Sequence, residues 1–487
     1  MRILMRGAID PLTDMNPAKF IIENHTGGNI GNMIFTNSIA RTLLVDENTV
    51  IDYVDLRRQK LNDAYAAFVN ETYDYFLIPL ANAFKSTNYD ELMIITDFVK
   101  KLKIPCCIIG VGIQRTISKD RFSEVYPHCA EAKAMVAAVL EKSPMIGVRG
   151  ELTGEFLKDL GFLPEKDYTV IGCPSMFTYG GTLPEIKPTV LSEDSVISFN
   201  SKVEFETLEG YRPFVEFAKR NMPLFPNMIY VQQQIDDVRM IYLDSIKQEL
   251  RKKKNYDVSK AVSFTNIPAW IDYFRENVDF SFGSRIHGNV AAILAGVPSV
   301  AVPFDRRVLE LAEYHNIPYI KVKPLGKYQT LYDVFEQADF SSVHRGHRER
   351  FDHYLDFLHT LGLDTIYDHD YTDTKIPYDK IMDARKFPGV IKAYEALNDA
   401  QKLERYKDSF TLYREIRKEL ADTLDETKRD LSAQKKTVKK QAAELEQLKK
   451  ENAELKETLN RNPLMRVLKA ILRRLRRLRS KKDAPSA

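Results

Sequence analysis

Apolar segments of strand length alternate with helix-like segments over the first 180 residues. The apolar runs at 73–79 and 104–114 are typical of strands that are buried on both faces of a parallel sheet. Between them, residues 89–103 carry apolar side chains three or four positions apart, which predicts an amphipathic helix. The alternation continues through a helix at 130–143, a strand at 144–150, a helix at 151–162 and a strand at 168–177. This rhythm predicts an α/β domain with a parallel sheet over residues 1–180.

A second alternation follows a Gly- and Pro-rich stretch at 179–188, which predicts a hinge. Its strand-like and helix-like segments lie at 195–200, 211–220, 227–234, 267–277 and 278–304. We therefore expect a second α/β domain at 189–363, and a fold of two Rossmann-like domains with a cleft between them. Residues 364–389 are rich in Asp, Tyr, Lys and Pro, which favours a surface connector with little core of its own.

Residues 390–462 contain neither Gly nor Pro and predict a long helix. In its later part a heptad repeat has a positions at Leu424, Leu431, Val438, Leu445, Asn452 and Leu459. Its d positions are Leu420, Leu448 and Leu455, interrupted by Thr427, Gln434 and Gln441. A single Asn at an a position favours a dimer in register, so we predict a parallel homodimer through residues 420–459. The polar d positions leave a solvated single helix as the alternative.

Residues 463–482 combine a stripe of apolar side chains, three or four positions apart, with Arg and Lys on the opposite face. This pattern predicts a basic amphipathic helix that lies in an anionic membrane surface, where each base contributes about 1 kcal/mol. RNA binding is the competing interpretation, but no aromatic residue is interleaved for base stacking.

The chain of 487 residues is 44% hydrophobic, which is enough to bury sizeable cores and excludes a wholly disordered protein. Its 71 Lys and Arg residues against 68 Asp and Glu residues give a net charge of +3. Ten of these bases fall between Arg461 and Lys482, so the rest of the chain has 61 bases against 68 acids. Such a mildly acidic body is unsuited to general nucleic-acid binding, and no nucleic-acid partner is expected.

The compartment is indicated by the cysteines and by the absence of long apolar runs. Four cysteines at irregular spacing argue against a disulfide framework and favour a reducing environment. The N-terminal segment has charge and Pro where a signal peptide needs an apolar stretch, and no apolar run of about 18 residues occurs. We therefore expect a cytoplasmic protein, held at the inner face of the plasma membrane through residues 463–482.

The strand that ends near Gly283 is followed by a helix that begins near Ile286. Arg285 and His287 therefore fall at the carboxyl edge of a parallel sheet, where α/β proteins bind ligands. A guanidinium offers two parallel donors to a phosphate or carboxylate, and an imidazole can transfer a proton. The alternative is that Arg285 caps a local carbonyl and that His287 is a structural histidine.

Two further places suit an anion or a substrate. Arg149 follows a short apolar strand and precedes a helix, although an Arg followed by Glu is also typical of a solvated helix start. A Gly-rich turn at 26–32 precedes another helix and can admit a substrate close to the backbone, which makes Asn29, Gly31 and Asn32 candidates for acceptor binding. This turn matches neither the P-loop nor GxGxxG.

No metal site is predicted. Asp368-His369-Asp370 resembles the metal motif of some sugar-nucleotide enzymes, but it lies in the expected connector and not at a strand end. Four histidines also cluster in an Arg-rich helical stretch without Cys, a composition that does not favour zinc: His344, His347, His353 and His359.

The chain resembles the polysaccharide pyruvyl transferase family over about residues 1–330. The matching segments are GGNIGNMIF, IIGVGIQ, IGVRGELTGEFLKDLGF with VIGCPSMF, and SRIHGNVAAILAGVPSVAVPFDRRVLELAEYHNIPYI. The resemblance implies a glycosyltransferase-B-like fold of two facing Rossmann-type domains. It also implies transfer of the enolpyruvyl group of phosphoenolpyruvate to a sugar as a cyclic ketal, with release of phosphate. The acceptor would be a residue of a cell-surface polysaccharide or of its lipid-linked precursor, and no cofactor is needed.

The resemblance implies roles for four residues. His287 matches the family's His, as the group that protonates the donor's methylene carbon. Three arginines would bind the donor: Arg285, which neighbours the His, Arg149 at the edge of the first domain, and Arg307, where the family has Lys. Asn32 and Cys173 stand where acids are common in the family, so no carboxylate base is implied at either position.

Two other functions remain open from the sequence. A glycosyltransferase that uses a nucleotide sugar shares the two-domain architecture. A non-catalytic scaffold would use the long helix and the basic helix to assemble partners at the membrane. Phosphate release from phosphoenolpyruvate in the presence of a glycan acceptor distinguishes these functions from pyruvyl transfer.

Overall fold

The first half of the computed structural model is built on short, mostly apolar strands. Its six strands are β1 (Arg2–Arg6), β2 (Val50–Val54), β3 (Tyr75–Pro79), β4 (Cys106–Ile109), β5 (Ile146–Val148) and β6 (Tyr168–Val170). The first four form an all-parallel sheet in the order β2-β1-β3-β4. β5 and β6 form a parallel pair, and a bridge between Val111 and Val148 links it to the segment after β4. Every residue of β3 and β4 is buried, as expected for parallel strands covered on both faces.

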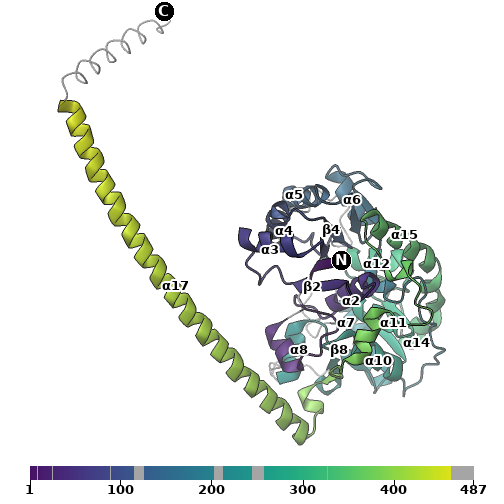
Figure 1. Ribbon diagram of the computed structural model, residues 1–487. Helices are drawn as coiled ribbons and strands as arrows, with labels where there is room; N and C mark the ends of the chain where they lie inside the picture. The colour runs from purple at the N-terminus through teal and green to yellow at the C-terminus, as the bar shows by residue number, and fades with distance from the viewer. Residues whose placement is uncertain are drawn as a thin grey trace, which may run out of the picture. The chain divides into compact units, whose positions relative to one another are not determined.

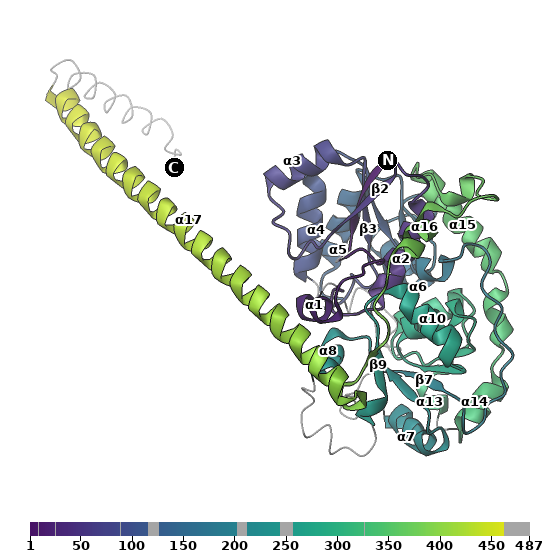
Figure 2. The ribbon, with the colours of Figure 1, turned by 60° about the horizontal axis from the view of Figure 1, so that its bottom comes forward.

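Helices cover this sheet with their apolar stripes. They are α1 (Pro17–Glu23), α2 (Asn32–Leu43), α3 (Asp63–Thr72), α4 (Tyr89–Lys101), α5 (Cys129–Leu140) and α6 (Glu151–Asp159), with the 3-10 helix η1 (Pro174–Phe177). Figure 2 shows α3, α4 and α5 grouped beside the strands. The ring of Phe76 on β3 meets that of Phe98 on α4 edge to face, with centroids 5.6 Å apart. The aromatic and aliphatic side chains between helices and sheet form one buried cluster.

A second sheet is parallel except at one edge. Its strands are β7 (Ile197–Asn200), β8 (Ile229–Val231), β9 (Ala261–Ser263), β10 (Phe280–Gly283), β11 (Ser299–Ala301) and β12 (Ile391–Lys392). They lie in the order β11-β10-β7-β8-β9-β12, and only β12 is antiparallel to its neighbour. The two sheets confirm the predicted fold of two Rossmann-like halves followed by a long helix.

The connections of this second half are helical. The α-helices are α7 (Arg212–Asn221), α8 (Ile235–Leu243), α10 (Ile267–Asn277), α11 (Ile286–Leu294), α12 (Arg306–Tyr314), α13 (Val322–Leu325), α14 (Leu331–Gln337), α15 (His347–Thr360) and α16 (Pro377–Ala384). The 3-10 helices are η3 (Met222–Leu224), η4 (Val258–Lys260), η5 (Phe340–His344), η6 (Ile366–Asp368) and η7 (Tyr394–Ala396). The strands of the second sheet share a second buried cluster with α7 and α14.

The Gly-rich turn at 26–32 joins the two halves. The backbone N–H of Ile30 donates to the carbonyl of Gln233 at 2.8 Å, and the N–H of Ile235 donates to the carbonyl of Gly28 at 3.0 Å. Both partners follow β8 of the second sheet. The turn of the first half is therefore held at the carboxyl edge of the second sheet.

The segment 364–389 is more than the surface connector that its composition predicts. Tyr378 of α16 is buried, and its hydroxyl donates to Asn37 Oδ1 of α2 at 2.8 Å. Asp379 accepts two hydrogen bonds from Arg41 of α2, at 3.1 and 2.9 Å. Only Thr365, Ile366 and Tyr378 of this fully described segment are buried, so its own core is small, and it is anchored to α2 by partners more than 300 residues away in the sequence.

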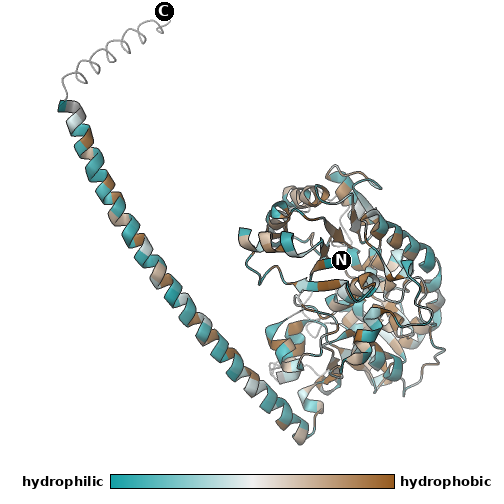
Figure 3. Cartoon of the chain, in the orientation of Figure 1, coloured by the Kyte–Doolittle hydropathy of each residue, from teal (hydrophilic) through white to brown (hydrophobic). Residues whose placement is uncertain are grey.

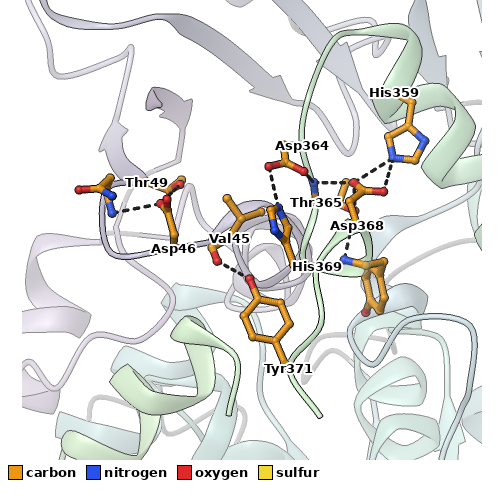
Figure 4. Close-up of polar contacts among 11 residues, drawn as sticks. Val45, Asp46, Thr49, His359, Asp364, Thr365, Asp368, His369 and Tyr371 are labelled. Atoms are coloured by element: carbon orange, nitrogen blue, oxygen red, sulfur yellow. Dashed lines mark hydrogen bonds and ion pairs between the residues drawn. The ribbon is translucent and has the colours of Figure 1, made fainter. Parts of the chain in front are cut away.

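The Asp368-His369-Asp370 triplet stabilises this segment locally (Figure 4). Asp368 accepts from the backbone N–H of Thr365 at 2.9 Å and pairs with His359 at 3.0 Å. His369 pairs with Asp364 at 2.7 Å. Asp370 accepts from the backbone N–H of Thr372 at 2.9 Å. The carboxylates thus serve as turn caps and as hydrogen-bond partners of His359 and His369.

The long helix α17 runs over Asp399–Arg461 and begins nine residues later than predicted. Residues 391–392 instead form β12, which pairs with β9. Asn398 and Gln401 exchange hydrogen bonds between side chain and backbone, at 3.1 and 2.9 Å, and this capping box sets the start of the helix. Figure 1 shows α17 as one uninterrupted helix.

The structure describes residues 1–7, 9–24, 26–87, 89–114, 126–201, 212–243, 257–325 and 327–461. The amphipathic helix predicted at 463–482 lies outside these residues. Residues Met1–Tyr406, which contain both sheets, form one unit, and Lys407–Ala487 form another. In the part of the chain that is described, no helix is long and apolar enough to cross a membrane.

Candidate active site

Arg285 and His287 lie where the sequence places them, at the turn from β10 into α11. Arg285 is the N-cap residue of α11, and its side chain makes no capping hydrogen bond. The strand ends at Gly283, where an added Cβ would lie 2.2 Å from the carbonyl oxygen of Asn200 on β7, so only glycine fits. Asn289 donates from Nδ2 to the carbonyl of Gly283 at 2.9 Å and stabilises the turn. The turn therefore places Arg285 and His287 at the carboxyl edge of the second sheet.

His287 is buried against the Gly-rich turn of the first half. A Cβ built on Gly31 would lie 2.6 Å from both Cβ and Nδ1 of His287, so the turn can approach the imidazole only because residue 31 is glycine. The side-chain Nε2 of His287 is buried and finds no hydrogen-bond partner among the described residues. This nitrogen is thus available for a bound molecule.

Arg149 is the most buried charge of the site. It directly follows β5, its residue is 1% exposed, and its Cζ lies 5.4 Å from the ring centroid of Phe35. Its Nε and Nη2 are buried and donate to no atom of the described chain. Burial lowers the pKa of the guanidinium, but an arginine stays protonated in proteins. Two buried, charged N–H groups without an acceptor are costly unless an anion binds them.

Arg307 approaches the same space from the first turn of α12. Its Nη2 donates to Asp305 Oδ2 at 3.2 Å, while Asp305 also caps α12 by accepting from the backbone N–H of Val308 at 3.0 Å. The ion pair holds the Arg307 side chain at the edge of the cavity. Its buried Nε has no hydrogen-bond partner in the described parts of the chain.

One cavity of about 820 Å³ is lined by these three arginines and His287. Asn29 and Asn32 of the Gly-rich turn line it as well, and Gly31 contacts His287 from the same turn. The structure therefore brings together all seven residues that the sequence singled out: Asn29, Gly31, Asn32, Arg149, Arg285, His287 and Arg307. They come from both halves of the fold, as a cleft between two domains requires.

The electrostatics of the cavity favour an anion. Burial, followed by the charges of Arg149, Arg307 and Arg285 in that order, lowers the pKa of His287 to about 3. The imidazole is therefore neutral at pH 7 in the free protein. A bound anion would offset the arginine charges and raise this pKa again.

Glu310 on α12 is a buried acid that the sequence gave no reason to select. Its carboxylate accepts from the hydroxyl of Thr153 at 3.0 Å and from the backbone N–H of Thr153 at 3.3 Å. Burial raises its pKa to about 7 against the opposing effects of the Thr153 hydrogen bonds and the Arg149 charge. In sequence, Glu310 looks like any acid on an amphipathic helix, because Thr153 is 157 residues away.

Gln233 is a second residue that the sequence interpretation missed. It lines the cavity, it is 2% exposed, and neither atom of its side-chain amide has a partner in the described chain. The signal was present, because residues 232–234 are three consecutive glutamines directly after an apolar strand. Two other amides, Asn82 and Gln114, line the cavity from the first half.

The described residues contain no group of three or more His, Cys, Asp or Glu side chains that could hold a metal ion. The acids nearest the arginines, Asp305 and Glu310, are both occupied by hydrogen bonds.

Comparison with known protein families decides the identity. The family model described as polysaccharide pyruvyl transferase matches residues 29–306, more than half of the chain. The chain belongs to the polysaccharide pyruvyl transferase family. The matched range begins in the Gly-rich turn and includes Arg149, Arg285 and His287, and Arg307 directly follows it. No curated protein matches this family member in sequence.

Solved structures with a similar arrangement are distant in sequence. A putative UDP-N-acetylglucosamine 2-epimerase from Listeria monocytogenes is 12% identical, with a TM-score of 0.41, over 77% of this chain and 99% of its own. The UDP-GlcNAc 2-epimerase from Methanocaldococcus jannaschii is 12% identical, with a TM-score of 0.39, over 73% of this chain and 100% of its own. The S. aureus MnaA-UDP co-structure is 8% identical, with a TM-score of 0.37, over 73% and 96%.

Proposed function

We propose that this family member transfers the pyruvyl group of phosphoenolpyruvate to a sugar residue of a cell-surface polysaccharide or its lipid-linked precursor. The observation that carries the proposal is Arg149, whose two buried N–H groups have no acceptor among the described residues. Arg285 and Arg307 line the same cavity. Phosphoenolpyruvate has a carboxylate and a phosphate, about three negative charges at pH 7, which complement three guanidinium groups.

The charge of the donor also prepares His287 for catalysis. In the free protein this imidazole is neutral, because burial and three arginines lower its pKa to about 3. Binding of a trianion among those arginines removes much of the opposing field and favours the imidazolium. The acid thus forms only when the donor is in place.

A single imidazole can carry all proton transfers. The imidazolium gives its proton to the methylene carbon C3 of phosphoenolpyruvate, which makes C2 electrophilic. A sugar hydroxyl then adds to C2, and the neutral imidazole takes the hydroxyl proton. In the second step the imidazolium gives this proton to the bridging oxygen of the departing phosphate. A second hydroxyl of the sugar closes the ketal and returns a proton to the imidazole, so that protons balance over the cycle.

The sugar would be bound by the amides that line the cavity. Asn82, Gln114 and Gln233 offer donors and acceptors that suit sugar hydroxyls. The Asn29 side chain accepts from the N–H of Gly31 at 2.8 Å, and that of Asn32 donates to the carbonyl of Thr26 at 3.0 Å. The other polar atom of each side chain, Nδ2 of Asn29 and Oδ1 of Asn32, is then offered to the sugar.

The composition of residues 463–482 supports an anionic membrane surface as the place of action. A lipid-linked acceptor would be concentrated there.

The test is phosphate release from phosphoenolpyruvate by the full chain with galactose-, mannose- or glucose-ended acceptors, together with detection of the ketal by mass spectrometry. Arg149→Gln should raise the KM for phosphoenolpyruvate at least about tenfold, because a buried charged donor pair is lost. Arg212→Gln is the matched control, since Arg212 is exposed on α7 and pairs with Glu216. Sugar transfer from a nucleotide sugar without any reaction of phosphoenolpyruvate would overturn the proposal.

A further inference from the structure

An apolar stripe runs along α17 and is exposed to solvent. Within Lys407–Arg461, the leucines and valine at the heptad positions are each at least 50% exposed: Leu420, Leu424, Leu431, Val438, Leu445, Leu448 and Leu455. Figure 3 shows hydrophobic positions, in brown, recurring between hydrophilic ones, in teal, along α17. From 420 to 455 the stripe extends for about 50 Å at 1.5 Å per residue. The stripe is continuous at the a positions and interrupted at three d positions, and a stripe of this length is typical of a helix that packs against another helix.

The charges beside the stripe indicate which partner fits. In a parallel dimer in register, each g position faces the e position five residues later on the other helix. On α17 the acids at g are Asp430, Glu444 and Glu451, and five residues beyond them stand the bases Lys435, Lys449 and Lys456. Every charged g-to-e pair would therefore join opposite charges. The remaining pairs involve Thr or Ala and add no repulsion.

An antiparallel dimer would instead place g beside g and e beside e. The acids at g would then face acids, and the lysines at e would face lysines, which is unfavourable. Asn452 also favours the parallel dimer in register, because a buried amide at an a position is satisfied best by the same amide of a second chain.

The contacts that Glu444 and Glu451 make within α17 leave both side chains able to pair with a second helix. Glu444 lies 3.9 Å from Lys440, and Glu451 accepts from Gln447 at 3.1 Å. Both contacts join exposed side chains four residues apart, and such pairs contribute little to stability.

We propose that residues 420–455 of two copies of this chain form a parallel coiled coil in register, with Asn452 paired to Asn452 and three g-to-e ion pairs on each side. This inference does not depend on the proposed function. It predicts a homodimer whose orientation is set by charge.

A charge exchange tests the pairing in the full chain. Variant one carries Glu444→Lys and Glu451→Lys, and variant two carries Lys449→Glu and Lys456→Glu. Each alone should dissociate at a concentration at least about tenfold higher than the parent, because four attractive pairs become repulsive. An equimolar mixture should restore the dimer. Sedimentation equilibrium measures the dissociation of each variant and of their mixture, and circular dichroism checks that the helix is retained.

A matched control changes the net charge by the same amount as variant one, but at positions outside the interface. Glu446→Lys with Glu454→Lys alters the b and c positions, which face away from the partner, and should leave dissociation unchanged. A parent chain that stays monomeric at micromolar concentration overturns the proposal. A dimer that is weakened by neither variant one nor variant two, as expected for an antiparallel pair, also overturns the proposal.

Disulfide cross-linking tests the orientation. In a parallel dimer in register, Leu455→Cys brings two d-position sulfurs within bonding reach, so most of the chain should cross-link in a glutathione buffer. Lys450→Cys, at the outward f position, should not cross-link above the parent's level. Equal cross-linking of both variants would overturn the proposed register.

Discussion

Glu310 of α12 caps the N-terminus of α6 through Thr153, with hydrogen bonds of 3.0 Å to the hydroxyl and 3.3 Å to the backbone N–H. The N-cap residue of α6 is Gly150, which has no side chain to perform this role. A Cβ on Gly150 would lie 2.7 Å from Glu310 Oε2, so the glycine leaves room for a carboxylate from the other half. Since Arg149 precedes α6 and Arg307 lies in the first turn of α12, this contact helps to set their relative position.

The first prediction concerns the pH dependence of stability. The pKa of Glu310 is raised by burial to about 7 from 4.5, so the folded protein holds this proton more tightly than the unfolded chain. Its contribution to stability is fully present below pH 4.5 and is lost as the pH rises through 7. The free energy of unfolding of the parent protein should therefore fall by about 1 to 3 kcal/mol between pH 5 and 8 through this group. Glu310→Gln should remove that decrease. Urea unfolding of the parent and of Glu310→Gln across this pH range measures the free energy of unfolding. The same pH dependence in both proteins would contradict the prediction.

Loss of the His287 imidazole should separate chemistry from binding. We expect His287→Ala to abolish turnover while phosphoenolpyruvate still binds within a few-fold of the parent affinity, because the arginines supply the binding charge. Single-turnover assays and calorimetric titration measure the two quantities. Near-normal turnover would remove His287 from the mechanism.

Arg285 and Arg307, the two partly buried arginines of the cavity, should respond differently to substitution by lysine. Arg285→Lys should raise the KM for phosphoenolpyruvate about tenfold or more, since a single ammonium cannot reproduce a planar fork. Arg307→Lys should cost about threefold at most, because Asp305 can pair with either base. Equal losses in both variants would refute this division of roles.

Gly31 should be required for the position of the imidazole. A methyl group there would lie 2.6 Å from His287, so Gly31→Ala must displace one of the two. We expect kcat to fall at least about tenfold, with donor affinity little changed. Gly389→Ala, where an added Cβ has nothing within 4 Å, is the control.

The basic segment should mediate membrane adsorption. A chain that ends after Arg461 should no longer sediment with anionic vesicles at low salt, because seven apolar residues and most of the ten clustered bases are lost. Activity on a soluble acceptor should be unchanged. If the full chain itself does not bind such vesicles, RNA or a protein becomes the better target for this segment.

The sequence by itself determined the elements and most of the site. Fully apolar runs such as 75–79 are stable only inside a sheet, so their local pattern specifies their burial. Arg285 and His287 could be selected because a strand-to-helix turn places them at the ligand-binding edge of a parallel sheet. The heptads of α17 are likewise visible in sequence, since the helix repeat is a local property.

Only the tertiary structure decided how the selected groups behave. The neutrality of His287 follows from its burial beside three arginines, of which only Arg285 is near it in sequence. The capping role of Glu310 and the burial of Tyr378 depend on partners 157 and 341 residues away. Desolvation and charge interactions depend on distance in space, and no local pattern of the chain encodes that distance.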